Sequence, residues 1–308
     1  MQRLTLILSD LYLPEDSVKS EVPRTHELPA FDWLLRFADR PLRIADWRRW
    51  LLAQTGHRPD DIWLATPVHL EARLDHARLV DRGLIRLGSQ ERHALRDEFA
   101  KVFGPQFELR DAGVRGFELA GLGAAGVRTV DPARLLGAEI GPAIPAPEAA
   151  DLRRLWAEIE MWLHSSTVNT AREKSRQRRV SALWLWRAPS VALRDPRTPG
   201  AAQLFLGDDP LMRRLSGASH EQPPVSAFPQ PDANSSGSVF AEFAPLSGQP
   251  HETLPALEAG WFAPARDALR EKRLESVQVV ANDRVFTVKA GADWKIWRRR
   301  RAWLQSLA

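Results

Sequence analysis

The 308-residue sequence contains no cysteine, which excludes disulfide bonds, thiolate zinc sites and a cysteine nucleophile. It also lacks an apolar run long enough to cross a bilayer, and the apolar stretch near its start is short and soon acidic, unlike a secretory signal. We therefore expect a cytoplasmic protein that does not bind membranes. Any metal ion would need histidine and carboxylate ligands.

The bulk composition is that of an ordinary globular protein, with 44% hydrophobic and 27% charged residues. A chain of this length forms one large domain or two of ordinary size, and we expect two. The pI is about 9.8, but a formal net charge of +4 over 308 residues is a low charge density. The composition therefore makes nucleic acid an unlikely partner.

The N-terminal region has the pattern of an α/β fold. Leu4 to Ser9 is a short apolar run that predicts a buried strand, and Asp10 follows it directly. Helical spacing of apolar residues predicts helices over 28–38 and after Asp46, and 62–65 is a further apolar run. Ligands of open α/β sheets lie at the carboxyl ends of strands, which makes Asp10 a candidate ligand-binding residue. The alternative is that Asp10 caps a turn.

The following region changes character and predicts a small α+β insert. The sequence indicates a helix over 91–103 with Ser89 as its N-cap, and a hairpin that turns at 111–113. Short strands are expected at 84–87, 107–110 and 114–120.

Beyond the expected insert, a long helix follows Pro147, and 183–186 is apolar enough for a central strand. Residues 218–238 are rich in Pro, Ser, Gly and Asn and predict a mobile loop. The last third predicts a helix over 253–270, interrupted at Pro264, and two strands at 276–280 and 284–288.

Three polar residues, His164, Asn169 and Arg172, stand between the long helix and the strand at 183–186. They offer donors that a turn or short helix could bring together, so they are candidates for binding a phosphate or carboxylate. The alternative is structural: His164 and Asn169 close the helix and bond to neighbouring backbone, while the arginines lie in solvent. His69, which closely follows an apolar run, is a weaker candidate with the same two interpretations.

The segment WLHSSTVNTAREKSRQRRVSALWLW resembles the archaeal-type cofactor-independent phosphoglycerate mutases of the alkaline phosphatase superfamily and the shorter bacterial RpfE-type regulatory proteins related to them. In those proteins a His-x-x-x-x-Asn-x-x-Arg segment precedes an apolar strand in a similar way. Leu28-Pro29-Ala30-Phe31-Asp32, Arg115 and Thr129-Val130-Asp131-Pro132 are similar to further motifs of the mutases, in the same order.

The resemblance implies a reduced phosphoglycerate mutase fold: a mostly parallel sheet flanked by helices, formed by residues 1–65 and 131–308, with the α+β insert at 66–130. It does not imply mutase chemistry. The mutases use two metal ions and a serine nucleophile, and the late histidine ligands have no match here, since only His220 and His251 follow Ser181. We therefore expect a pseudoenzyme without metal or cofactor, which serves as a regulatory or scaffolding protein with a protein partner.

Two alternative functions stay open. One is a residual metal-dependent phosphatase or mutase with Asp10, His69 and Asp208 or Asp209 as ligands. The other is a nucleic-acid-binding regulator that uses the C-terminal basic tail, Trp297 with Arg298, Arg299, Arg300 and Arg301. Against the second alternative, the tail's tryptophans could instead dock on the core and leave the arginines in solvent.

Overall fold

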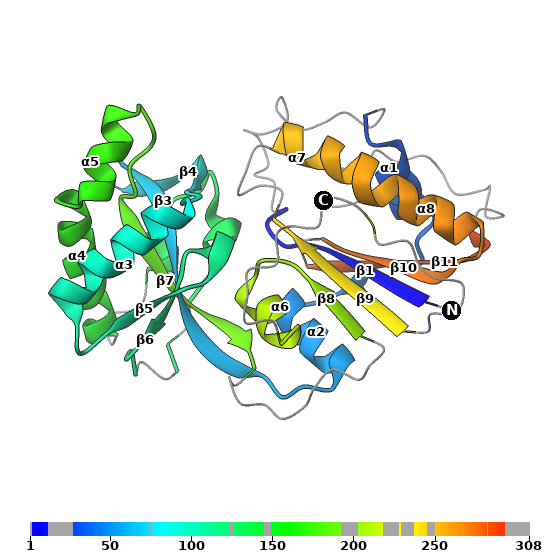
Figure 1. Ribbon diagram of the computed structural model, residues 1–308, viewed down its shortest axis with the longest axis horizontal. Coiled ribbons are helices and arrows are strands. Elements are labelled where there is room, and N and C mark those ends of the chain that lie inside the picture. Colours follow the sequence, from blue (N-terminus) through cyan, green and yellow to red (C-terminus); the bar gives the residue numbers. More distant parts are fainter. Residues whose placement is uncertain are drawn as a thin grey trace. The chain divides into compact units, whose positions relative to one another are not determined.

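The computed structural model describes residues 2–11, 27–73, 76–123, 126–127, 129–144, 149–191, 203–217, 228, 237–244, 250–281 and 283–292. Its internal contacts divide the chain into two compact units (Figure 1). Unit 1 comprises residues 1–11, 20–59 and 190–308. Unit 2 comprises residues 12–19 and 60–189. Each unit has its own sheet and its own helices.

Unit 1 contains a six-stranded sheet in the order β2-β11-β10-β1-β9-β8. Four neighbouring strands are parallel, and they are β10 (Leu274–Ala281), β1 (Gln2–Leu8), β9 (Gly237–Phe243) and β8 (Gln203–Leu206). The other two add antiparallel at one edge, β11 (Arg284–Lys289) and β2 (Leu42–Arg43). The predicted α/β class with a mostly parallel sheet is confirmed.

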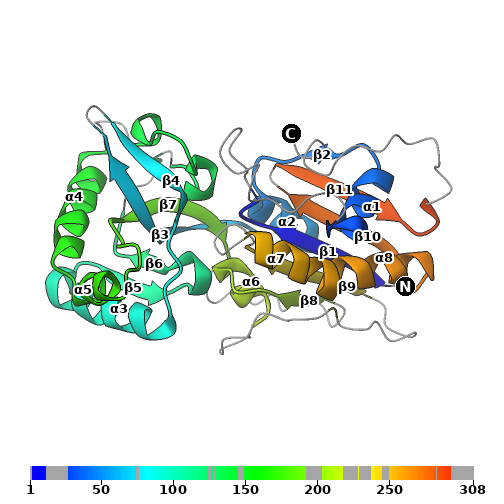
Figure 2. The same cartoon turned by 90° about the horizontal axis from the view of Figure 1, so that it is seen from above.

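Helices cover both faces of this sheet (Figures 1 and 2). One face carries α1 (Pro29–Phe37), α7 (Pro250–Leu257) and α8 (Ala263–Arg270). The other face carries α2 (Trp47–Thr55) and α6 (Pro210–Leu215). Successive side chains of a strand point to opposite faces of the sheet. Ile7 of β1 points to the face covered by α2 and α6, and it belongs to the same core cluster as their buried apolar residues. Asp46 caps α2 as its side chain accepts from the backbone N–H groups of Arg48 and Arg49.

A buried carboxylate ties α1 to the helical segment near the end of the chain. Glu258 accepts hydrogen bonds from the backbone N–H of Ala30 at 2.6 Å and of Phe31 at 3.0 Å. It belongs to a π-helix, Glu258–Phe262, that separates α7 from α8. The predicted helix over 253–270 is therefore interrupted at this π-helix, and Pro264 lies in the first turn of α8, where proline needs no donor.

Unit 2 contains an antiparallel sheet in the order β4-β3-β6-β5, with β7 also paired to β3. Its strands are β3 (Asp60–Ala72), β4 (Ala77–Leu84), β5 (Glu108–Asp111), β6 (Phe117–Ala120) and β7 (Ala182–Ser190). Its α-helices are α3 (Ser89–Phe103), α4 (Ala150–His164) and α5 (Thr167–Lys174). Short 3-10 turns lie at Gly113–Arg115, Pro132–Leu135 and Gly141–Ala143.

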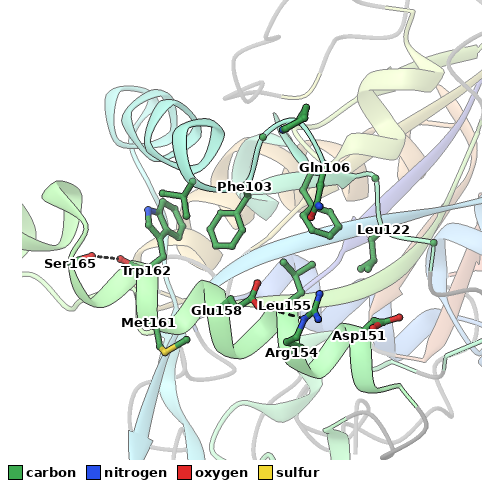
Figure 3. A pocket seen from close by; sticks show the side chains of 16 residues that line it. Phe103, Gln106, Leu122, Asp151, Arg154, Leu155, Glu158, Met161, Trp162 and Ser165 are labelled. Carbon is green, nitrogen blue, oxygen red and sulfur yellow. Dashed lines mark hydrogen bonds and ion pairs between the residues drawn. The ribbon is translucent and has the colours of Figure 1, made fainter.

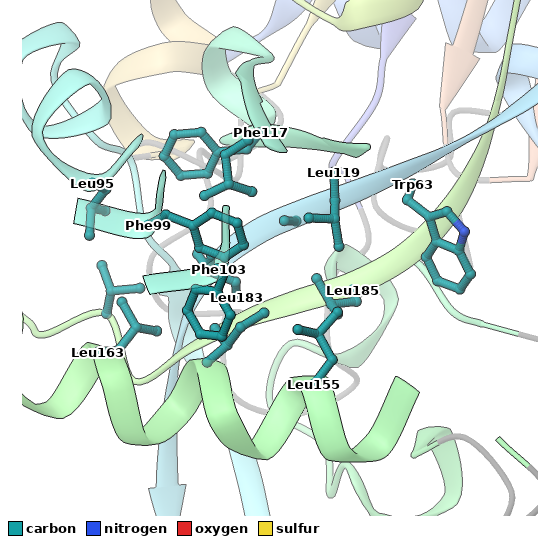
Figure 4. Close-up of a cluster of buried hydrophobic side chains, with 14 of the residues drawn as sticks. Trp63, Leu95, Phe99, Phe103, Phe117, Leu119, Leu155, Leu163, Leu183 and Leu185 are labelled. Atoms are coloured by element: carbon teal, nitrogen blue, oxygen red, sulfur yellow. The ribbon is translucent and has the colours of Figure 1, made fainter. Parts of the chain in front are cut away.

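The core of unit 2 lies between its sheet and helices α3 and α4 (Figure 4). Phe99 is fully buried and stacks on Phe103 with ring centroids 4.4 Å apart, and Trp162 of α4 meets both rings edge-on. Leu183 and Leu185 bring β7 into the same cluster. Every buried member of this cluster lies between Trp63 and Leu185, so unit 2 has a hydrophobic core of its own.

Several boundaries differ from the predicted ones. The contact-defined unit 2 extends to residue 189, beyond the insert predicted at 66–130, because α4, α5 and β7 share its core. The strand predicted at 84–87 is instead β4, which ends at Leu84, and the N-cap of α3 is Gly88 rather than Ser89. Of the loop predicted at 218–238, only Phe228, Gly237 and Ser238 are described.

Candidate functional site

Asn169 is buried in the corner where α4 is followed by α5 and the start of β7. Its side-chain amide donates to the backbone carbonyls of Leu163 and Val180, both at 2.8 Å. Its oxygen accepts from the backbone N–H of Val180, also at 2.8 Å. With an exposed fraction of 2%, Asn169 holds the corner together through main-chain groups on both sides.

Arg172 is also buried, and its guanidinium has two partners within unit 2. Nε donates to the backbone carbonyl of Arg178 at 2.7 Å, and Nη1 bonds to Oε1 of Glu91 at 2.6 Å. Oε2 of Glu91 in turn accepts from the backbone N–H of Gly88 at 2.7 Å, at the start of α3. This network connects α5 to the N-terminus of α3.

The two histidines are placed differently. His164 is the last residue of α4 and is exposed, while its backbone carbonyl accepts from Arg179 at 3.1 Å. His69 lies on β3, with its ring Nδ1 3.0 Å from the backbone oxygen of Arg179. The contacts of Asn169 favour the structural alternative over an anion site, because its groups serve the main chain. That alternative was wrong for Arg172, which is buried and paired with Glu91 instead of lying in solvent.

Asp10 lies at the carboxyl end of β1 in unit 1, as predicted, and is buried. The neighbouring Ser9 donates its hydroxyl to Oε1 of Glu242 at 2.5 Å, which joins the ends of β1 and β9. Gly207 follows β8, and a Cβ there would stand 2.9 Å from Cβ of Glu242, so the close packing of this edge requires a glycine.

Asp209, a ligand in the metal hypothesis, is engaged in the structure of unit 1. Its carboxylate bonds to Nη2 of Arg48 at 2.5 Å, and it caps α6 by accepting from the backbone N–H of Leu211 at 3.0 Å. Both charged side chains are almost fully buried. Asp10 belongs to unit 1 and His69 to unit 2. Across the described ranges, no group of three or more His, Asp or Glu residues is arranged to hold a metal ion.

A groove on unit 2 was not predicted from the sequence (Figure 3). It has a volume of about 1080 Å³ and lies between α4, the end of α3 and two loops. The residues that line it are Val102, Phe103, Gly104, Pro105, Gln106, Phe107, Gly121, Leu122, Gly123, Asp151, Arg154, Leu155, Glu158, Met161, Trp162 and Ser165.

One stripe of α4 forms a full side of the groove. Six of its residues, from Asp151 to Trp162, contribute at spacings of three and four, and Ser165 directly after the helix continues the stripe. At about 1.5 Å per residue the stripe is roughly 21 Å long. Apolar and charged groups alternate along it, and Nε of Arg154 lies 3.5 Å from Oε1 of Glu158.

The apolar surface of the groove is partly open to solvent. Met161 is 68% exposed and Val102 is 59% exposed, which is high for apolar side chains of this size. On the opposite wall Gly121 has φ of +94°, and a Cβ there would stand 2.1 Å from the backbone oxygen of Gln106. Glycine therefore allows the two loops to meet closely beside the groove.

The sequence contained a signal for this groove. The apolar face of α4 that packs on the core includes Leu155 and Trp162, and Met161 extends it sideways beyond what the core needs. An apolar stripe wider than its core contact indicates a second surface. The rest of the groove is formed by the end of α3 and by the loops at 104–107 and 121–123, and these come together only through tertiary packing.

The basic tail at 297–301 lies outside the described residues. Among the helices that the structure describes, none combines the length and the apolar character that crossing a membrane requires.

Comparison with protein-family models gave no match, and comparison with curated protein sequences gave none either. Among solved structures, the chain is similar to a cofactor-independent phosphoglycerate mutase from Thermoplasma acidophilum DSM 1728, with 14% identity, a TM-score of 0.35, and coverage of 94% of this chain and 90% of that chain. It is also similar to the PH0037 protein from Pyrococcus horikoshii, with 12% identity, a TM-score of 0.42, and coverage of 94% and 87%. These values are too low to place the chain in a family.

Proposed function

We propose that this chain is a non-catalytic binding protein with a regulatory or scaffolding role. The observation that supports this most strongly is the use of its buried polar side chains inside the fold. Asn169 makes three hydrogen bonds to main-chain groups, Arg172 pairs with Glu91, and Asp209 pairs with Arg48 while it caps α6. Groups engaged in this way stabilise the fold, and using them as ligands would break those bonds.

The groove of unit 2 is the proposed binding surface. Its lining combines solvent-exposed apolar side chains with a rim of charged ones, as binding sites do. Its polar groups are partly paired with each other, since Arg154 contacts Glu158 and the Ser165 hydroxyl donates to the carbonyl of Trp162 at 3.0 Å. This chemistry suits recognition of a partner. An evolutionary relation to the phosphoglycerate mutases, and to the RpfE-type proteins, is part of the proposal.

The test is a turnover assay on the purified full-length protein. Hydrolysis of p-nitrophenyl phosphate is measured with added manganese, zinc or magnesium, for the wild type and for Asp10→Ala. The proposal predicts the same background rate for both proteins under every condition. Metal-dependent turnover in the wild type that Asp10→Ala abolishes would instead support the phosphatase alternative and its metal ligand at the end of β1.

A further inference from the structure

We propose that the groove of unit 2 binds an amphipathic helical segment of a partner protein, with basic side chains next to its apolar anchors. The inference deepens the proposed function and rests on it, since it assigns an occupant to the same surface. It follows from the length of the groove, from its exposed apolar side chains and from its charge.

The length of the groove suits a helix. The α4 stripe from Asp151 to Ser165 extends over four helical turns, roughly 21 Å. A second helix alongside it would present residues at i, i+3, i+4 and i+7 to the same stripe, which is how amphipathic helices occupy apolar grooves. The volume of about 1080 Å³ slightly exceeds the range of small-molecule sites, roughly 300–1000 Å³, and the groove is open.

The apolar anchors of such a helix would meet Met161 and Val102, which are mostly exposed, and the edges of Phe103, Leu122 and Trp162 (Figure 3). Apolar side chains gain free energy when a partner removes them from water. The flexible thioether of Met161 can adapt to different side chains, which is useful on a surface that receives a peptide.

The charges along α4 favour a basic partner. The groove is lined by two acidic side chains, Asp151 and Glu158, and by one basic side chain, Arg154, which leaves a formal charge of −1. Glu158 already contacts Arg154, so Asp151 is the acid to which a lysine or arginine of the partner would be attracted. These charged side chains belong to the rim of the groove, and an acyl chain would offer no polar group to Asp151.

The experiment is a selection of random peptides of about fifteen residues, the length of the α4 stripe, on the immobilised full-length protein. Peptides that also bind Val102→Thr/Met161→Gln are removed, because that double variant lowers the apolar character of the groove with little change in side-chain size. Both positions are exposed, so the variant should fold normally, which circular dichroism checks. The retained peptides should carry apolar residues at helical spacing and a net positive charge.

Fluorescence anisotropy then measures the retained peptides on single variants. Affinity should fall about tenfold with Met161→Gln, because the partner removes this exposed apolar side chain from water, and several-fold with Asp151→Asn, because the variant loses the charge. Leu42→Gln and Leu204→Gln are the matched controls, since both leucines are exposed apolar residues of unit 1. Both controls should leave affinity unchanged.

Three outcomes would overturn the inference. In the first, no peptide prefers the wild type over the double variant. In the second, the retained peptides are acidic or lack apolar residues at helical spacing. In the third, sedimentation shows a wild-type dimer that Met161→Gln dissociates. The last outcome would assign the groove to a second copy of the chain. If no peptide is selected and no phosphatase turnover is seen, the helical occupant is refuted and the proposed function is not. Metal-dependent turnover would refute the proposed function.

Discussion

At the corner after α4, the side chain of Asn169 supplies hydrogen bonds that no regular element provides. Two carbonyls and one N–H of the main chain point into this buried corner, and the amide of Asn169 matches all three. A side chain with both donor and acceptor groups is needed there, which explains why an asparagine fits better than an aspartate or a leucine.

Replacement of Asn169 by alanine should therefore lower stability. The carbonyl and N–H of Val180 lose the side-chain partner, while the carbonyl of Leu163 keeps the N–H of Ser166 at 3.2 Å. A buried main-chain group without its partner costs about 1–3 kcal/mol, so Asn169→Ala should cost about 2–4 kcal/mol in urea unfolding. The exposed His164→Ala is the control and should stay within about 0.5 kcal/mol. If Asn169 bound an anion instead, the variant would keep its stability and lose affinity for inorganic phosphate.

The pair Arg172–Glu91 should also be energetically coupled. Its side chains are 8% and 28% exposed, whereas those of Arg154–Glu158 are 76% and 46% exposed. A double-mutant cycle with Arg172→Met and Glu91→Gln should give a coupling energy of about 1–2 kcal/mol. The same cycle on Arg154 and Glu158 should give less than about 0.5 kcal/mol. Equal coupling in both cycles would contradict the structural role of Arg172.

The sequence could not decide between the two roles of these residues. The spacing of His164, Asn169 and Arg172 is compatible with an anion site, where their donors converge, and equally with a structural role at the end of the helix. The deciding partners are Glu91, which is 81 positions from Arg172, and Val180, which lies on the far side of α5. Such contacts are fixed by tertiary packing, which local patterns do not reveal.

At the scale of elements, the link between α1 and the π-helix depends on a buried acid. Burial raises the pKa of the Glu258 carboxyl above the usual 4.5, while the N–H groups of Ala30 and Phe31 act in the opposite direction. The folded protein then binds a proton at Glu258 more tightly than the unfolded chain does. The associated stability is fully present below pH 4.5 and is lost as the pH rises through the folded-state pKa.

Comparison of the wild type with Glu258→Gln over pH isolates this effect. The free energy of unfolding of the wild type, minus that of the variant, should decrease as the pH rises from about 4.5 and then level off once Glu258 is ionised. Urea unfolding at a series of pH values measures it. A difference that stays constant or increases over that range would show that burial does not raise this pKa.

Most elements could be predicted because their patterns are local. The helices α2 and α4 follow from apolar periodicity and from the cap at Asp46. The hairpin of β5 and β6 was also predicted, but its turn lies at 112–116 instead of 111–113, because Gly113–Arg115 forms a 3-10 turn before β6. The strand predicted at 84–87 lies too far toward the C-terminus, because β4 comprises Ala77–Leu84. The sequence of β4 contains Asp81 and Gly83, which have low strand propensity, so pairing with β3 determines its position.

At the scale of the whole molecule, the two units have separate sheets and hydrophobic cores. Unit 2 exceeds the predicted insert because α4 and β7 pack on the same core as α3. The long helix and its following strand looked from the sequence like parts of the parallel domain, since nothing local distinguishes a strand of one sheet from a strand of another. The α4 side of the groove had a signal in the sequence, but the full groove, which needs α3, α4 and two loops, depends on tertiary packing.

A fragment of residues 60–189 should fold on its own. It is a continuous segment that contains every buried member of the core cluster and the sheet of unit 2 apart from Ser190, the last residue of β7. Expressed alone, it should show one cooperative urea transition by circular dichroism, and Phe99→Ala should lower its stability by about 3–5 kcal/mol because that ring is fully buried. A non-cooperative transition would mean that unit 2 depends on the rest of the chain.

The central claim is that the polar side chains of this chain serve its fold and a binding surface rather than metal-dependent catalysis. Elemental analysis of the purified full-length protein, dialysed after incubation with manganese and zinc, tests it most directly. The account predicts far less than one divalent ion per chain. Retention of about two ions per chain, as two-metal hydrolases hold, and their loss with Asp10→Ala would contradict it.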